Sequence, residues 1–85
     1  MRAEEREMVE CYYRLRCQDT DRYLCVSEEG NLVPCADKRR ADQFAEELIE
    51  FTLPVAEVQF DTEFRLLRVP GEELDFRRMH GVINQ

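Results

Sequence analysis

The sequence predicts an α+β fold, a small and mostly antiparallel sheet with helices packed on one face. Two observations support this class. Apolar residues alternate with polar ones in the first 35 residues and again after residue 54, which is typical of strands. Between these regions, and near the end of the chain, the spacing and charge order are those of helices. The expected order is β-β-β-α-β-β-α, and a length of 85 residues predicts a single domain over residues 1–85.

The first three strands follow from alternation and turn chemistry. Residues 9–17 place every second, mostly apolar side chain on one face, and the polar run 18–21 then predicts a turn. Residues 22–27 form the second predicted strand, and a turn at Gly30 leads to a third over residues 31–35. Pro34 cannot donate a backbone hydrogen bond, so we expect this third strand at an edge of the sheet.

The first helix is predicted from five apolar residues spaced at i, i+3, i+4, i+7 and i+8. They are Ala41, Phe44, Ala45, Leu48 and Ile49. Asp37 is the expected N-cap, and we expect the helix to stop before Pro54. The basic residues 38–40 would oppose the helix dipole in a first turn, so a later start near Ala45 stays open as an alternative.

Alternation resumes after Pro54. Residues 55–60 predict a fourth strand and residues 64–69 a fifth, and residues 55–69 could form either a hairpin or one bent strand. Residues 72–80 carry acidic side chains first and basic side chains last, and Gly81 follows them. This order matches the helix dipole and a glycine C-cap, so a second helix is predicted there.

The residues offer little catalytic chemistry. Ser27 is the only serine and His80 the only histidine, and they fall in different predicted elements. The three glycines are too far apart for a phosphate-binding loop. We therefore expect a non-catalytic protein without a cofactor.

The four cysteines have spacings of C-x5-C, C-x7-C and C-x9-C, a poor pattern for zinc. We expect buried free thiols. A Cys25–Cys35 disulfide and a cysteine-dependent metal or redox module are the alternatives.

Acidic charge is concentrated in residues 41–64, which contain seven carboxylates and no Lys or Arg. We expect these residues to bind a partner: Asp42, Glu46, Glu47, Glu50, Glu57, Asp61 and Glu63. The expected partner is a protein with a basic surface, because a pI near 4.7 argues against direct binding to nucleic acid or to an anionic membrane. A merely solvated helix face is the alternative. The first ten residues have no apolar segment of the signal-peptide type, so we expect a cytoplasmic protein.

The stretch YYRLRCQDTDRYLCVSEEGNLV, followed by ADQF, AEELIEF and VAEVQF, resembles small ββαβ proteins of phages and prophages. The resemblance covers about residues 12–60 and consists of hydrophobic spacing, and residues 64–85 extend beyond it. That group includes anti-CRISPR inhibitors, several of which present acidic surfaces to nucleic-acid channels. The resemblance implies a phage-type inhibitor and no particular site residues. A structural or regulatory subunit of a homo-oligomer, such as a homodimer, is the other candidate.

Overall fold

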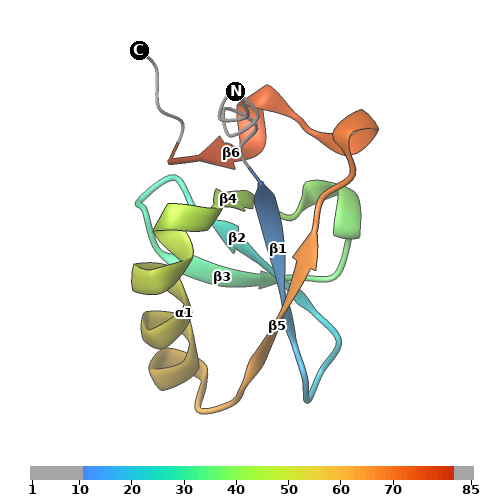
Figure 1. The fold of residues 1–85 in the computed structure, drawn as a ribbon. Coiled ribbons are helices and arrows are strands. Elements are labelled where there is room, and N and C mark those ends of the chain that lie inside the picture. Colours follow the sequence, from blue (N-terminus) through green and yellow to red (C-terminus); the bar gives the residue numbers. More distant parts are fainter. Residues whose placement is uncertain (1–10, 82–85) are drawn as a thin grey trace.

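The computed structural model describes residues 11–81, and within them the fold is α+β with six strands and one α-helix (Figure 1). In chain order the elements are β1 (Tyr12–Cys17), β2 (Tyr23–Val26), β3 (Leu32–Cys35), the 3-10 helix η2 (Lys38–Arg40), β4 (Gln43–Ala45), α1 (Glu46–Phe60), β5 (Phe64–Arg68), the 3-10 helices η3 (Gly71–Glu73) and η4 (Phe76–Arg78), and β6 (Met79–His80). The predicted start of the first strand at residue 9 lies outside the described residues.

The sheet is built around β1, which pairs antiparallel with β2, β4 and β5. The hydrogen-bonded neighbours follow the order β3-β2-β1-β4-β6, and β5 pairs with β1 outside this path. Among the pairs described, only β4–β6 is parallel. The mostly antiparallel sheet is therefore confirmed. So is the position of β3 at an edge, as Pro34 predicts.

The first helix begins and ends later than its apolar spacing predicts. Residues 43–45 form β4, because Phe44 and Ala45 pair with Tyr13 and Tyr12 of the central strand. Asp37 does act as an N-cap, but of the 3-10 helix η2, where its side chain accepts a hydrogen bond from the Arg39 N–H. The alternative start near Ala45 agrees with the observed first residue, Glu46.

The fourth predicted strand, residues 55–60, is wrong: these residues complete α1, and Pro54 lies inside the helix instead of ending it. Both the hairpin and the bent strand expected for residues 55–69 are therefore replaced by a helix followed by β5.

The second predicted helix is wrong as well. Residues 71–80 form two 3-10 helices and a short strand. The buried side chain of Gln43 explains this, since it binds the Glu73 carbonyl and the Asp75 N–H and so fixes an irregular path.

Two apolar clusters cover opposite faces of the sheet. The larger lies beneath α1 and contains Leu15, Cys17, Leu24, Phe44, Ile49, Ala56 and Phe64. The smaller contains Tyr12, Ala45 and Val69, with Met79 packed against it. The segment after β5 runs across the end of the sheet to β6 (Figure 1), and its contacts with Arg14 and Gln43 cover the face turned away from α1. No helix within residues 11–81 is long and apolar enough to cross a membrane.

Candidate interaction surface

A backbone hydrogen bond ties the first turn of α1 to the central strand, and another caps the last turn. The Glu46 N–H donates to the Cys11 carbonyl at 2.9 Å, which ties the first turn to the start of the central strand. At the other end Asp61 adopts a left-handed conformation (φ 54°) and its N–H donates to the Glu57 carbonyl. Aspartate tolerates this conformation better than most residues, so Asp61 gives the helix a defined end.

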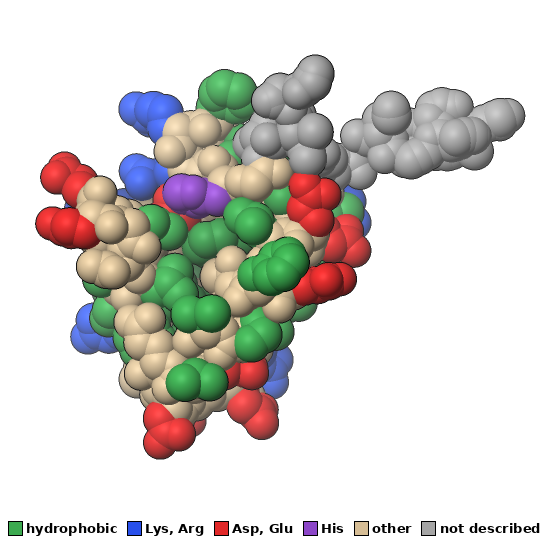
Figure 2. Space-filling view, turned by 90° about the vertical axis from the view of Figure 1, so that its left-hand side faces the viewer, with side chains coloured by type: hydrophobic (Ala, Val, Ile, Leu, Met, Phe, Trp, Pro, Cys, Tyr) green, Lys and Arg blue, Asp and Glu red, His purple; other side chains and the backbone are tan. Residues whose placement is uncertain are grey.

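The helix buries one side and leaves an apolar strip on the other. Ile49 and Ala56 are buried against the sheet. Phe51, Val55 and Val58 are exposed, with 70% of Phe51 and 82% of Val58 accessible to solvent. Their spacing of i, i+4 and i+7 places them in one line along the outer surface, and we call these three residues the apolar strip. Figure 2 shows hydrophobic side chains gathered in the middle of this face.

Carboxylates lie at both ends of the apolar strip. Glu46, Glu47 and Glu50 are exposed on the first turns of α1, and Asp61 and Glu63 are exposed after its last turn. From Glu46 to Asp61 the helix rises about 22 Å. None of these five carboxylates forms a salt bridge with another residue of the described range 11–81. Acidic side chains also border this face in Figure 2.

The two acidic groups differ in their effect on the helix. Glu46 and Glu47 occupy the first turn, where negative charge is favoured by the helix dipole. Asp61 and Glu63 follow the last turn, which has no basic residue, and there the dipole disfavours negative charge. The acids at the amino end therefore help the fold, whereas those at the carboxyl end carry an electrostatic cost.

Two of the expected partner-binding residues have roles within the fold. Glu57 is half-buried, and its carboxylate accepts the Phe64 N–H at 3.4 Å. Asp42 is only 8% exposed and lies in the chain just before β4, not on a helix. Its carboxylate accepts the Val26 N–H at 2.5 Å and lies 2.9 Å from Nε2 of His80. Asp42 therefore does not share a helix face with Glu46 and Glu50, because the chain changes from strand to helix at residue 46.

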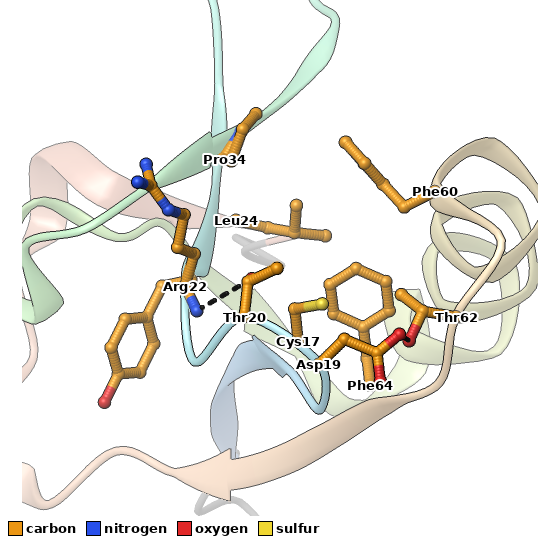
Figure 3. Close-up of a pocket in the computed structure, with 10 residues that line it drawn as sticks. Cys17, Asp19, Thr20, Arg22, Leu24, Pro34, Phe60, Thr62 and Phe64 are labelled. Atoms are coloured by element: carbon orange, nitrogen blue, oxygen red, sulfur yellow. Dashed lines mark hydrogen bonds between the residues drawn. The ribbon is translucent and has the colours of Figure 1, made fainter.

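A separate apolar cavity of about 250 Å³ opens between β2 and the end of α1. Figure 3 shows Cys17, Leu24, Phe60 and Phe64 around it, with Thr62 turned toward Asp19. Burial alone would raise the pKa of Cys17. Hydrogen bonds from the Thr20 hydroxyl and from nearby backbone N–H groups outweigh burial and lower that pKa.

This cavity does not assemble a cysteine–histidine pair, since His80 is bound to Asp42 at β6. The other three thiols are also free, and the pKa of Cys25 is raised to about 12, chiefly by burial and by the neighbouring Cys35. No cluster of three potential metal ligands occurs among the described residues.

No protein-family model, curated protein or solved structure matches this chain. Sequence reasoning missed the apolar strip, because Val55 and Val58 were assigned to a strand. The i, i+4, i+7 spacing of its residues, which continues across Pro54, is the signal that could have revealed it.

Proposed function

We propose that this chain is a non-catalytic protein-binding module that places α1 in an apolar groove bordered by basic side chains. The apolar strip, with carboxylates at both ends, is the observation that carries the proposal. An apolar centre with a charged rim is the usual composition of a protein–protein interface. Placing one helix face in a groove is a common mode of recognition.

Charge complementarity favours a basic partner over a second copy of this chain. α1 contains no Lys or Arg. Two copies that met through their α1 helices, in either orientation, would bring carboxylates against carboxylates. Like charges that face each other cost affinity, so a homodimer through this face is disfavoured. A phage-type inhibitor of the anti-CRISPR kind is one form that such a module can take, and it belongs to the same proposal.

Paired variants in a capture experiment test the proposal. The protein is immobilised and exposed to lysate of its source cell, and any bound protein is identified and then purified for titration. Phe51→Ser with Val58→Ser removes most of the apolar strip, and Glu46→Lys with Glu50→Lys reverses part of its rim. Both variants should weaken binding of the purified partner by at least about tenfold. Wild-type affinity should also fall as salt is added.

The control is Glu28→Lys with Glu29→Lys, which makes the same charge change in the exposed turn between β2 and β3. It should leave affinity within about twofold, since this turn is not part of α1. If the control loses as much affinity as the α1 variants, net charge and not the α1 surface drives binding. If the strip variant binds as tightly as wild type, the helix is not the binding element.

A further inference from the structure

We propose that the chain also binds a small phosphate monoester with an aromatic group, in a cavity on the face of β1 turned away from α1. The cavity has a volume of about 630 Å³ and lies between η2 and the segment of residues 72–77. This volume falls within the range of about 300–1,000 Å³ that is typical of small-molecule sites. The cavity shares no residue with the apolar strip.

Among the basic residues that line the cavity, Arg14 is the one that lies in the sheet, on β1. Its side chain is only 4% exposed, and its Nη1 donates to Oε1 of Glu73 at 2.8 Å. Its Nε is also buried and has no hydrogen-bond partner in the part of the chain that the structure describes. Because this Nε is buried, a ligand in the cavity would meet the positive charge of the guanidinium and not this donor.

The wall opposite η2 is held rigidly. Nε2 of Gln43 donates to the Glu73 carbonyl at 3.1 Å, and Oε1 of Gln43 accepts the Asp75 N–H at 3.1 Å. The Asp75 carboxylate in turn accepts the Arg77 N–H and caps η4. Residues 73–77 are therefore positioned before any ligand arrives, which lowers the entropic cost of binding.

The charges at the cavity favour an anion. The lining holds four cations and three carboxylates, a net charge of +1. Glu73 is paired with Arg14 and Asp75 with Arg77, whereas Glu72 is exposed and forms no salt bridge with another described residue. Lys38 and Arg39 are exposed and form no salt bridge with another described residue, so their charge remains available to a ligand. The pKa of Glu73 reports this field: the hydrogen bond from Arg14 lowers it most, and Lys38 and Arg39 lower it further.

The cavity also has an apolar part. Leu74 and Phe76 line it, and 79% of Phe76 is exposed. An exposed aromatic ring beside two available cations suits a ligand with a planar ring and an anionic head. A phosphate monoester carries up to two negative charges and accepts several hydrogen bonds from Arg and Lys, so it matches this arrangement better than a single carboxylate.

Adenosine 5′-monophosphate is a suitable probe, titrated into ¹⁵N-labelled protein and followed by amide chemical shifts. We expect saturable changes confined to residues 38–39 and 72–77, with much weaker effects from adenosine. Lys38→Ala with Arg39→Ala should weaken binding by at least about tenfold. Phe76→Ala should weaken binding of this probe and leave the weaker binding of inorganic phosphate unchanged.

Arg65→Ala with Arg68→Ala is the matched control, because it removes two exposed cations from β5, outside the cavity. It should change affinity by less than about twofold. The proposal is overturned if no saturation is seen up to about 10 mM probe. It is overturned equally if adenosine binds as well as its phosphate or if the control loses as much affinity as the η2 variant.

Discussion

Asp42 connects three segments that are distant in the sequence. Its N–H donates to the Leu24 carbonyl of β2, and its carboxylate accepts from Val26 and contacts His80 of β6. The sequence placed Asp42 among acids on a helix face because residues 41–49 fit a helical period. Only the pairing of the neighbouring Phe44 with Tyr13 of β1, a long-range contact, decides that this part of the chain is extended.

Asp42→Ala should therefore cost about 1.5–3 kcal/mol of stability, because a part-buried N–H and the imidazole of His80 both lose their carboxylate partner. Glu47→Ala, at an exposed position, should stay within about 0.5 kcal/mol of wild type. Urea unfolding of the two variants measures both values. Equal losses would mean that the Asp42 carboxylate does not hold these partners in solution.

Arg14 shows what alternation can and cannot predict at the level of one residue. The period of two in β1 correctly puts Leu15 and Cys17 on the face beneath the helix and Arg14 on the other. It cannot show that the second face is also covered, because the covering residue, Glu73, is 59 positions away.

The Glu73–Arg14 pair should make stability depend on pH. The hydrogen bond from Arg14 holds the pKa of Glu73 below its ordinary value of 4.5. Ionised Glu73 therefore contributes stability that is fully present above pH 4.5 and is lost as the pH falls through the folded-state pKa. The free energy of unfolding of wild type and of Glu73→Gln, measured from pH 7 to pH 3, should differ most at neutral pH and converge in acid. Parallel profiles would contradict this assignment.

At the level of elements, the sequence predicted β1, β2, β3 and β5 close to where they lie, and it misplaced α1. Ala56 and Phe60 are four residues apart, a spacing that fits both a strand face and a helix face. Val58, between them, distinguishes the two: it would share their buried side in a strand but is exposed in the helix. Pro54 suggested a stop, yet the helix continues through it. Packing of Ile49 and Ala56 against the sheet outweighs the cost of the proline.

The helix phase can be tested by comparing two large apolar side chains. Ile49→Ala should cost about 2–5 kcal/mol, because it leaves a cavity beneath α1. Phe51→Ala removes a larger side chain but should change stability by only about 0.5 kcal/mol, because the ring is mostly exposed. Chemical denaturation of both variants decides the matter. A large loss from Phe51→Ala would show that the apolar strip is packed within the fold and is not available to a partner.

Over the whole molecule, sequence reasoning predicted the α+β class, and it located the acidic surface only in part. Glu46, Glu47, Glu50, Asp61 and Glu63 do lie on or beside one helix. They form two groups separated by the apolar strip, because α1 runs through the segment predicted to be a strand. The cavity beside Arg14 could not be predicted, since its walls are η2 and residues 72–77, which are far apart in the sequence and come together only in the fold.

The formal charge of −7, all of it contributed by residues 41–64, should make the fold sensitive to salt. Repulsion among these carboxylates acts against the compact state. Raising the ionic strength from about 0.01 M to about 0.15 M shortens the Debye length from about 30 Å to about 8 Å, so the wild-type melting temperature should rise. Circular dichroism at several salt concentrations measures this. A melting temperature that falls would show that attractive ion pairs dominate the charge balance.

Two double variants that each remove two negative charges separate general repulsion from the helix dipole. Asp61→Asn with Glu63→Gln relieves charge at the end of α1 where the dipole disfavours it, so stability at low salt should rise by about 0.3–1 kcal/mol per charge. Glu46→Gln with Glu47→Gln gives the same net charge but also loses a favourable interaction with the amino end, so this variant should gain less or lose stability. The difference between the two should shrink as salt is added, because both effects are screened. Equal gains from both variants would mean that net charge alone, and not its position along α1, sets the electrostatic cost of this fold.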